Sequence, residues 1–454
     1  MKMTNDMMEW LYSNLDLIEE CKENNLKPVI LVAGASSSGK SYMSNILSNF
    51  LKERNYRIAT ISTDDYNSGL AKDMFTLVNK KYYHNSLKNS EYCIEKIKEI
   101  IIDSEFKEKF CSRNLKLIRN SIGQFIGANI NEFLAYIKYE FENINFDRKE
   151  LYNLDEVSND IKDLIDGKTI TRKEYSKKIS ERIETNEVIN GNDIDVILVE
   201  GIYALTEEVR KQVNPNNLIC NFIECDSKNL FLRRVIRDVK ITGQPKSFII
   251  KNYFKYVTPE YFKTILPTKE NADIILQNNM KFEELRTGEI ETQQKYKIDK
   301  EEVQKLLKKS IIIKKEHQTD TFFGKKGEKN ILRLRECGNE QNEMTPYSLV
   351  YKSSPKLRKD KSLIRQVHVL ADENDLKFIF KNKEELENCF SKIGIKKRHT
   401  IKKTRLLVNY LGHIIKLDAM GGNYYMEIDK LEKQDEYLAS IPKTVSNEFI
   451  NENE

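Results

Sequence analysis

The feature that most constrains this chain is a strand, a glycine-rich turn and a helix in direct succession near the N-terminus. Residues 29–33 read Val-Ile-Leu-Val-Ala, a continuous apolar run that predicts a strand buried on both faces. The next eight residues, Gly34-Ala-Ser-Ser-Ser-Gly39-Lys40-Ser41, fit the pattern G-x-x-x-x-G-K-[ST], and a helical pattern follows them. Such a loop belongs to a parallel α/β sheet and turns its backbone N–H groups around phosphate oxygens.

The side chains of this loop indicate a nucleotide site. Lys40 would reach the β and γ phosphates, and the Ser41 hydroxyl would ligate Mg²⁺. A flexible glycine-serine turn, the alternative, requires neither the strand before it nor the helix after it. We therefore expect ATP and Mg²⁺ as cofactors, with the nucleotide held by Gly34, Ser36, Ser38, Gly39, Lys40 and Ser41.

Further apolar runs extend the predicted sheet. They lie at residues 56–62, 195–200, 218–224 and 272–276, with a helical stretch at 227–239. Alternating strands and helices predict a parallel sheet covered on both faces. Residues 67–142 show no strand signal but have apolar residues at helical spacing, so we expect a helical insertion there.

Acidic residues follow two of the predicted strands. Asp64 and Asp65 come after the second strand, and Glu200 ends the third. Ligands of open α/β sheets bind at the carboxyl ends of the strands. An acid there can take the proton from an attacking hydroxyl or hold Mg²⁺, although an Asp pair after a strand is also a common helix cap.

Together these residues resemble the uridine kinase and phosphoribulokinase family over about residues 28–66 and 143–277. Beside the loop, the resemblance rests on short runs that begin at Thr63, Asn145, Val199, Arg233, Pro267 and Ala272. It implies a P-loop kinase that transfers the ATP γ-phosphoryl group to a hydroxyl. It further implies that Asp64 is the general base, that Glu200 lies beside the metal, and that Arg233, Arg234 and Arg237 lie on a lid helix and act on the phosphates. A solvated basic helix face remains the alternative for at least one of these arginines.

The sequence departs from this family on the acceptor side. Asn67 replaces a second aromatic residue, and Arg148 replaces a histidine. Near Tyr175, serines stand at 176 and 180 and a lysine at 177, where the family has base-contacting groups. We therefore expect intact phosphate chemistry but weak selectivity for uridine, and the acceptor can be another small hydroxyl compound.

The last third of the chain has a different periodicity. Eight runs of period two lie at residues 289–299, 312–323, 329–337, 345–352, 363–370, 398–409, 412–419 and 423–430, with helical stretches near 300–309 and 383–393. Eight successive strands predict a closed antiparallel barrel. The expected architecture is an α/β P-loop parallel sheet (residues 1–285, including the insertion) followed by an eight-stranded antiparallel β-barrel, an α+β domain (286–454).

Charged residues recur at period two on these strands, so each set shares one face. The ordinary interpretation is that they face solvent. However, the order of motifs from Glu291-x-Gln-x-Lys295 to Glu427-x-Asp429 resembles the CYTH, or triphosphate tunnel, family over about residues 289–430. That resemblance implies a polar interior in which basic side chains bind inorganic polyphosphate or ATP and carboxylates hold Mg²⁺ or Mn²⁺. The implied phosphate ligands are Lys295, Arg333, Arg335, Lys352, Lys403 and Arg405, and the implied metal ligands are Glu291, Glu427 and Asp429.

Gln293 stands where that family has a glutamate, which weakens the case for catalysis in the barrel. The leading hypothesis is a kinase of uridine kinase type joined to a barrel that binds or hydrolyses polyphosphate. The alternative is a tri- or pyrophosphatase regulated by a nucleotide-binding, kinase-like domain. Adenylate cyclase chemistry would use the same tunnel, and no residue selects it.

Composition and charge bear on three further properties: nucleic-acid binding, membrane insertion and location in the cell. The net charge of +5 is too small to indicate nucleic-acid binding, and no run of 18 apolar residues predicts a membrane span. Seven dispersed cysteines and an N-terminus without a signal-peptide pattern favour a cytoplasmic protein. Formation of an oligomer is left open.

Overall fold

The structure is a computed structural model that describes residues 4–68, 120, 145–176, 181–279, 288–338, 345–359, 362–429 and 444–445. The predicted insertion at 67–142 lies outside the described residues, except for 67, 68 and 120. The chain divides into two compact units: an N-terminal unit of residues 1–234 and 238–279, and a C-terminal unit of residues 235–237 and 280–454. In the described part, none of the helices is long and apolar enough to span a membrane.

The N-terminal unit contains a parallel sheet of five strands in the order β2-β5-β1-β6-β7. The strands are β1 (Val29–Gly34), β2 (Ile58–Ser62), β5 (Val196–Glu200), β6 (Leu218–Glu224) and β7 (Ile274–Gln277). Their bounds agree with the predicted runs to within two residues. The continuous apolar run of β1 is fully buried because this strand is central and covered on both faces.

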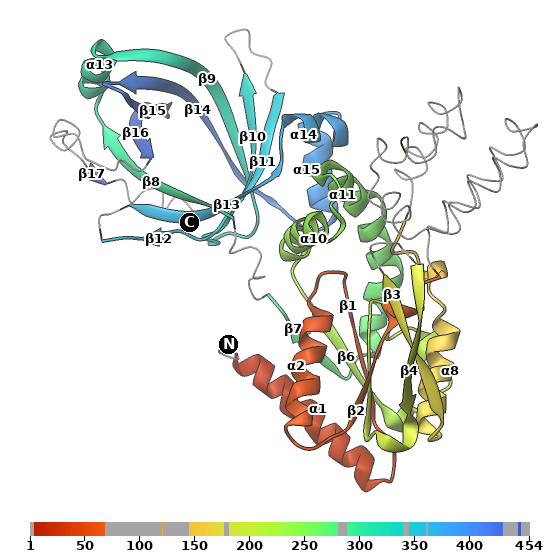
Figure 1. Cartoon of the computed structure of the whole chain (residues 1–454). Coiled ribbons are helices and arrows are strands. Elements are labelled where there is room, and N and C mark those ends of the chain that lie inside the picture. Colours follow the sequence, from red (N-terminus) through yellow and green to blue (C-terminus); the bar gives the residue numbers. More distant parts are fainter. Residues whose placement is uncertain are drawn as a thin grey trace, which may run out of the picture. The chain divides into compact units, whose positions relative to one another are not determined.

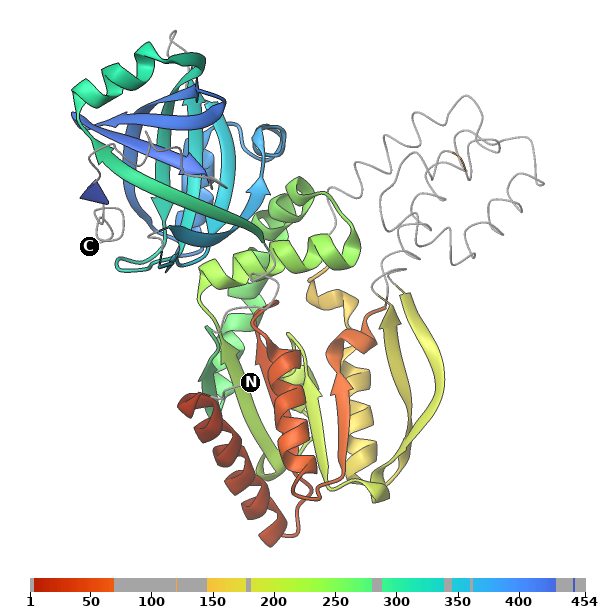
Figure 2. The ribbon, with the colours of Figure 1, turned by 60° about the vertical axis from the view of Figure 1, so that its left-hand side comes forward.

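Helices cover both faces of this sheet, with α1 and α2 on one side and α8 on the other (Figures 1 and 2). Val29 and Leu31 of β1 belong to the same buried cluster as Val157 and Ile161 of α8. The described helices of this unit are α1 (Asn5–Glu23), α2 (Lys40–Lys52), α8 (Leu154–Ile165), α9 (Glu207–Arg210), α10 (Ser227–Thr242), α11 (Lys246–Asn252) and α12 (Thr258–Glu260). The expected doubly covered α/β sheet is confirmed.

A two-stranded antiparallel hairpin of β3 (Thr169–Ser176) and β4 (Glu181–Asn190) was not predicted. Most side chains of β3 are exposed or half-buried, so the strand lacks the apolar alternation by which strands are recognised. The hairpin matters for the site because it carries Tyr175 and Arg182.

The C-terminal unit is a closed antiparallel barrel. Eight strands follow in the ring order β13-β11-β10-β9-β14-β15-β16-β8, and pairing of β8 with β13 closes it. They are β8 (Glu289–Ile298), β9 (Ser310–Phe323), β10 (Ile331–Gly338), β11 (Thr345–Lys352), β13 (Leu363–Ala371), β14 (Lys397–Tyr410), β15 (His413–Met420) and β16 (Asn423–Asp429). All eight predicted strands are confirmed, and short strands β12 (Lys356–Leu357) and β17 (Thr444–Val445) pair at the margins.

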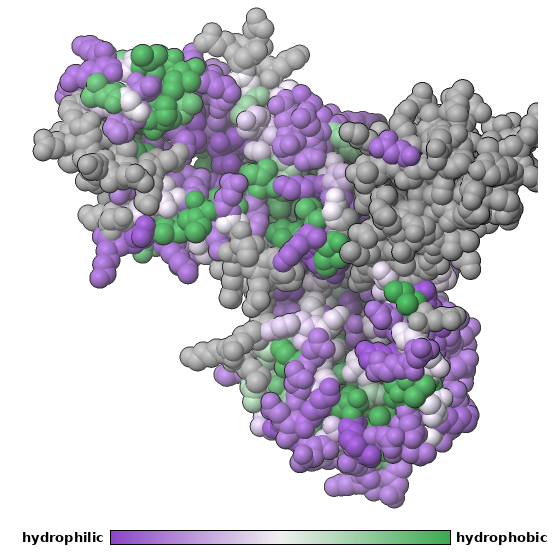
Figure 3. All heavy atoms as spheres, in the orientation of Figure 1, coloured by the Kyte–Doolittle hydropathy of each residue, from purple (hydrophilic) through white to green (hydrophobic). Residues whose placement is uncertain are grey.

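In the part of this unit that the structure describes, three helices accompany the barrel: α13 (Lys300–Lys308), α14 (Glu373–Ile379) and α15 (Lys383–Lys392). The first and third were predicted, whereas α14 was not. Leu306 of α13 packs with Val408 and Ile415 in a buried cluster. Beside α13, the outer surface at the start of β9 is apolar (Figure 3), because Ile311, Ile312 and Ile313 are each at least half exposed.

Candidate functional site

The glycine-rich loop leaves β1 in a conformation that requires its first glycine. Gly34 has φ +146°, and a Cβ there would lie 2.3 Å from the carbonyl oxygen of Ile223 on β6. The loop ends where α2 begins, at Lys40. The hydroxyls of Ser37 and Ser38 are buried and have no hydrogen-bond partner among the described residues. Buried polar atoms of this kind fit a ligand that brings hydrogen-bonding groups of its own, as phosphate oxygens do.

Lys40, Ser41 and Glu200 converge at the carboxyl ends of neighbouring strands. Lys40 is buried, and its Nζ donates to the carbonyl oxygen of Ala35 at 2.9 Å. Ser41 Oγ donates to Glu200 Oε2 at 3.1 Å, and Ser62 Oγ donates to Oε1 at 2.9 Å. In the sheet register, Glu200 lies between Ser62 of β2 and Val32 of β1. The strand order β2-β5-β1 therefore brings together the loop and the predicted acids.

The two aspartates after β2 have different surroundings. They lie in a short 3₁₀ helix, Thr63–Tyr66, and Gly201 allows this turn to approach β5, since a Cβ on Gly201 would lie 1.7 Å from Thr63 Oγ1. Asp65 accepts the backbone N–H of Tyr175 at 3.0 Å, which ties it to the hairpin. Burial raises the pKa of Asp65 to about 6.

Burial, and next the charge of Asp64, raise the pKa of Glu200. Neighbouring carboxylates in a buried site repel each other and favour a cation between them. Mg²⁺ commonly takes one or two carboxylates, a hydroxyl and phosphate oxygens as ligands. Ser41 and Glu200 therefore fit a magnesium site.

The predicted arginines lie on α10. Arg233 is buried and donates to the carbonyl oxygens of Ser38 at 3.1 Å and Asn278 at 3.0 Å. Arg234 donates to the hydroxyl of Ser36 and forms ion pairs with Asp147, at 3.0 Å, and with Asp238. Neither side chain lies on a solvated helix face, and Arg237 is half-buried. In this arrangement Arg233 and Arg234 hold the loop itself.

The hairpin side of this site carries a second charged network. Tyr66 donates from its hydroxyl to Asp160 at 2.6 Å, and Lys173 of β3 pairs with the same carboxylate. Arg182 of β4 donates two hydrogen bonds of 2.8 Å to Glu156. Because these cations already have carboxylate partners, the network positions the hairpin against α8.

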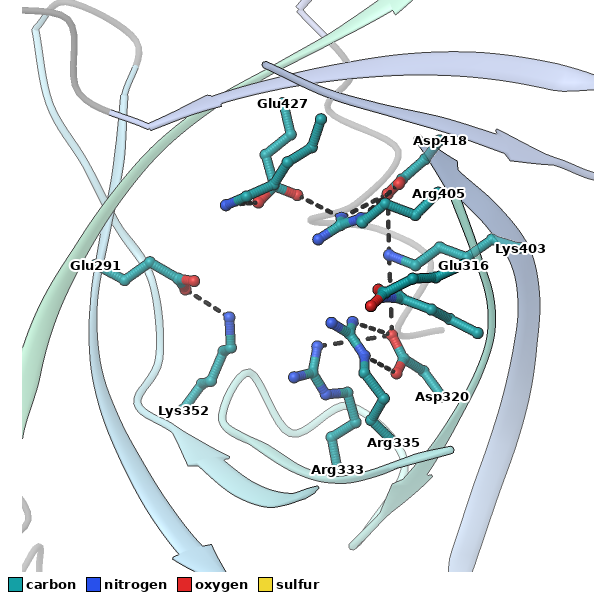
Figure 4. Close-up of polar contacts among 12 residues, drawn as sticks. Glu291, Glu316, Asp320, Arg333, Arg335, Lys352, Lys403, Arg405, Asp418 and Glu427 are labelled. Atoms are coloured by element: carbon teal, nitrogen blue, oxygen red, sulfur yellow. Dashed lines mark hydrogen bonds and ion pairs between the residues drawn. The ribbon is translucent and has the colours of Figure 1, made fainter. Parts of the chain in front are cut away.

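The barrel encloses a cavity of about 340 Å³. Charged side chains from successive strands point into it (Figure 4), so the solvent-facing interpretation of these strands is wrong. Among the described residues, eight basic and four acidic side chains line the cavity, an excess of four basic groups. All six predicted phosphate ligands are among them, and the other charged lining residues are Arg365, Lys416, Glu291, Asp320, Asp418 and Glu427.

Each buried carboxylate of the cavity is shared by several cations. Asp320 accepts two hydrogen bonds of 2.7 Å from Arg335 and lies 3.6 Å from Arg333 (Figure 4). Burial alone would raise the pKa of Asp320, but the charges of Arg333 and Arg335 lower it far below its ordinary value. Asp418 is bound in the same way by Arg405, at 2.6 and 2.7 Å, and by Lys403.

Glu427 is the most heavily paired of these acids. Lys295, Arg405 and Lys416 lie 3.0 to 3.2 Å from it, and Gln293 donates to it at 3.1 Å. Burial would raise the pKa of Glu427, but these cations lower it well below its ordinary value. Gln293 supplies a donor at the position where a second carboxylate would repel Glu427.

The predicted metal role of these carboxylates does not fit this arrangement. Glu427 already has four donors, and Glu291 pairs with Lys352 at 2.5 Å. The described residues contain no group of three acids, histidines or cysteines placed to hold a metal. The side chain of Asp429 is outside the described part of the chain.

Burial lowers the pKa of two cavity lysines. It brings Lys352 to about 7, with Arg333 adding repulsion, and Lys403 to about 8. Both lysines therefore gain charge most readily when an anion enters the cavity, because an anion raises the pKa of a nearby amine.

With the glycine-rich loop at the carboxyl end of a parallel sheet, the N-terminal unit has the features of a P-loop domain. Residues 121–285 match the family model described as Phosphoribulokinase / Uridine kinase family. This part of the chain is similar to that family.

Curated relatives agree with this match. The chain is 37% identical over 133 residues to uridine-cytidine kinase B of Dictyostelium discoideum, an alignment that covers 29% of this chain and 52% of that protein. It is 31% identical over 132 residues to the uridine kinase of Halalkalibacterium halodurans, with 29% and 60% covered. The chain thus spans between half and two thirds of the length of these relatives. A solved possible uridine kinase from Bacillus stearothermophilus aligns with 15% identity over 58% of this chain and 99% of its own, with a TM-score of 0.29.

Some site residues were not predicted. Asn278 follows β7 and donates from Nδ2 to the carbonyl oxygen of Ser38 at 2.8 Å, and no sequence signal marks it. Asp320 and Asp418 lie in motifs of the sequence but had been given no role. Their alternation with the inward-facing Phe322 and Lys416 was a signal that could have identified them.

Proposed function

We propose that the N-terminal unit is an ATP-dependent kinase of uridine kinase type, which transfers the γ-phosphoryl group to a hydroxyl of a nucleoside or another small acceptor. The observation that carries this proposal is the convergence of Lys40, Ser41 and Glu200 beside the Asp64–Asp65 turn. The family match of residues 121–285 and the names of the relatives support it.

The chemical step needs a base, a cation at the phosphates and an acceptor oxygen in line. We assign the base to Asp64, the role that the family resemblance implies for it, and to Asp65 the hydrogen bond that holds the backbone of Tyr175. Asp64 would take the proton of the acceptor hydroxyl as its oxygen bonds to the γ-phosphorus and the bond to the β-phosphate oxygen breaks, releasing ADP. Lys40 would stabilise the charge on the β and γ oxygens, the role that the family resemblance also implies for Arg237.

Magnesium, when bound, would supply positive charge that offsets the negative charge of the phosphates. Ser41 and Glu200 would hold it. In this assignment Glu200 has no role as base, because its oxygens are directed to Ser41 and Ser62.

The test is phosphoryl transfer from ³²P-labelled ATP by the full chain. Asp64→Asn should lower kcat by about 10²-fold or more and leave the KM for ATP nearly unchanged, since a general base acts on the acceptor. Asp65→Asn is the matched control and should have a much smaller effect on kcat. The reverse pattern would assign the base to Asp65, and transfer by both variants at the parent rate would contradict the proposal.

For the C-terminal unit we propose binding of a polyphosphate anion, inorganic triphosphate or ATP, in the barrel cavity. The excess of four basic side chains suits an anion of about four negative charges, and Arg333, Arg335 and Arg405 offer charge-assisted hydrogen bonds. Since the described carboxylates act as counter-charges for these cations, we assign no reaction step to a metal here. Binding of labelled triphosphate that is lost on Arg405→Met would support this role, and absence of binding would contradict it.

The second candidate is a tri- or pyrophosphatase in the barrel with the kinase-like unit as its regulator. Gln293→Glu distinguishes the two. A gain of metal-dependent hydrolysis in this variant would indicate a weakened enzyme, and unchanged hydrolysis with intact binding favours a binding module. Cytoplasmic location stays a prediction.

A further inference from the structure

The cavity of the barrel is not uniformly charged. Most of its uncharged lining residues occupy the same end of the antiparallel strands, since they lie near the ends of β9 and β15 and near the starts of β10, β13, β14 and β16. Six of the eight uncharged lining residues make up this end, namely Phe322, Ile331, Leu363, His399, Met420 and Tyr425, and the other two are Gln293 and Ile401. Four of the paired cations labelled in Figure 4 come from positions further along β10 and β14, namely Arg333, Arg335, Lys403 and Arg405, whereas Lys352 at the end of β11 is the cross-strand neighbour of Ile331. The cavity therefore has an apolar, aromatic end next to a cationic middle.

Two rings at this end are already arranged as a stack. Phe322 and His399 are directly paired across β9 and β14, with ring centroids 4.7 Å apart and planes 16° apart. Both rings line the cavity and are half-buried, so each presents only its remaining surface to a ligand. Burial and the nearby Arg398 lower the pKa of His399, so its ring is mainly neutral at pH 7. A neutral ring can stack on another flat ring without adding cationic charge.

The aromatic end is within reach of the phosphate-binding groups. Phe322 is the cross-strand neighbour of Arg333 in the register of β9 and β10. The next inward position on β9 is Asp320, two residues or roughly 6.6 Å along the strand, where Arg335 is bound. A ligand with a phosphate chain at these arginines would place its other end against Phe322 and His399.

Resting on the proposed binding of polyphosphate in the barrel, we propose that Phe322 and His399 form a base-stacking subsite that makes the cavity selective for nucleoside triphosphates over inorganic triphosphate. Stacking of a base on an aromatic side chain contributes about 1–3 kcal/mol, which corresponds to a gain in affinity of roughly 5- to 150-fold. Stacking tolerates all four bases, because every base offers a flat face. The subsite should therefore distinguish the presence of a base more than its identity.

The experiment is displacement of ³²P-labelled inorganic triphosphate from the full chain carrying Lys40→Ala, which removes the lysine of the other nucleotide site. The competitors are ATP and ribose 5-triphosphate, which share the sugar and phosphate chain and differ in the base. We expect ATP to compete at a concentration about tenfold lower than ribose 5-triphosphate. Phe322→Leu should abolish this difference, and His399→Leu should reduce it. Both variants should bind inorganic triphosphate as the parent does, which also shows that the barrel is folded.

Equal competition by ATP and ribose 5-triphosphate in the parent would overturn the subsite and leave the polyphosphate proposal standing. If Phe322→Leu weakened the binding of inorganic triphosphate, ATP and ribose 5-triphosphate equally, the subsite would also be overturned. Phe322 would then serve only to maintain the structure of the barrel. If labelled triphosphate does not bind at all, the proposal for the barrel fails and the subsite with it.

Discussion

The ion pair of Arg335 with Asp320 provides a sharp test of the barrel interior. Arg335→Met removes the guanidinium but keeps much of the apolar stem. Asp320, whose side chain is 5% exposed, would lose both of its 2.7 Å hydrogen bonds. The remaining cations lie 3.6 and 3.9 Å away, too far for good hydrogen bonds. Removing one partner of a buried pair costs about 3–5 kcal/mol.

This loss can be measured by amide hydrogen exchange of the full chain, followed in peptides from β9 and β10. A loss of 3–5 kcal/mol should lower the protection of the slowest amides by about 10²- to 10³-fold or more. The double change Arg335→Met with Asp320→Leu should recover a large part of the loss, because it leaves no unpaired carboxylate. The exposed pair Lys377–Glu373 on α14 gives the control, and Lys377→Met should cost less than about 0.5 kcal/mol.

The chain contains one tryptophan, Trp10, which is buried in the N-terminal unit. Its fluorescence should not change in these barrel variants, so local destabilisation can be told from global unfolding. If the amides of β9 and β10 in Arg335→Met were as well protected from hydrogen exchange as in the parent, Asp320 would not be a buried carboxylate that depends on its cations.

Four further outcomes are expected. Asp65→Asn should raise the free energy of unfolding at pH 7 by up to about 3 kcal/mol, because the pKa of Asp65 is raised to about 6. In urea unfolding, this gain should grow from pH 4 to 6 and vanish below about pH 4. A gain that does not depend on pH would contradict this explanation. Asn221→Leu should lower the free energy of unfolding by about 2 kcal/mol, because the indole N–H of Trp10 and the side chain of Asn14 lose a buried hydrogen-bond partner. Urea unfolding followed by Trp10 fluorescence measures this loss, and an unchanged midpoint would show that the network does not stabilise the fold. Triphosphate binding by the chain with Lys40→Ala should persist in EDTA, measured by equilibrium dialysis, and a requirement for Mg²⁺ would restore a metal role to the cavity. Steady-state assays should find kcat/KM for uridine and cytidine within about tenfold of that for other nucleosides, whereas strong selectivity for uridine would show that Arg148 and Ser176 do not replace recognition groups.

Periodicity predicted the parts of this fold whose pattern is set by burial. The central strand β1 is apolar throughout because both of its faces are covered. In the barrel strands, polar and apolar residues alternate, because one face of each strand lines the cavity and the other lies on the outside of the barrel. The hairpin β3–β4 escaped prediction because its exposed strands carry charges on both faces. For the same reason its role in holding Asp65 could not be foreseen.

The charge arrangement of the cavity could be predicted only in part. Alternation showed that Arg333 and Arg335 share a face, but which face is inward depends on closure of the barrel. The pairing of Arg405 with Asp418 depends on the register of β14 and β15, and that of Glu427 with Lys295 on the register of β16 and β8. Neither register can be predicted from the sequence of one strand alone, because it depends on how the two strands pair. The metal role of Glu427 was implied by the resemblance to the triphosphate tunnel family, whereas the structure surrounds this carboxylate with Lys295, Arg405 and Lys416.

The kinase assignment is tested most directly by phosphoryl transfer from ³²P-labelled ATP to a panel of nucleosides, measured for the full chain and for Lys40→Ala. No other basic side chain of residues 34–41 can replace Lys40 at the β and γ oxygens. The account predicts transfer by the parent and less than about 1% of that rate in Lys40→Ala, with binding of inorganic triphosphate in the barrel unchanged. Transfer by Lys40→Ala at the parent rate would contradict it.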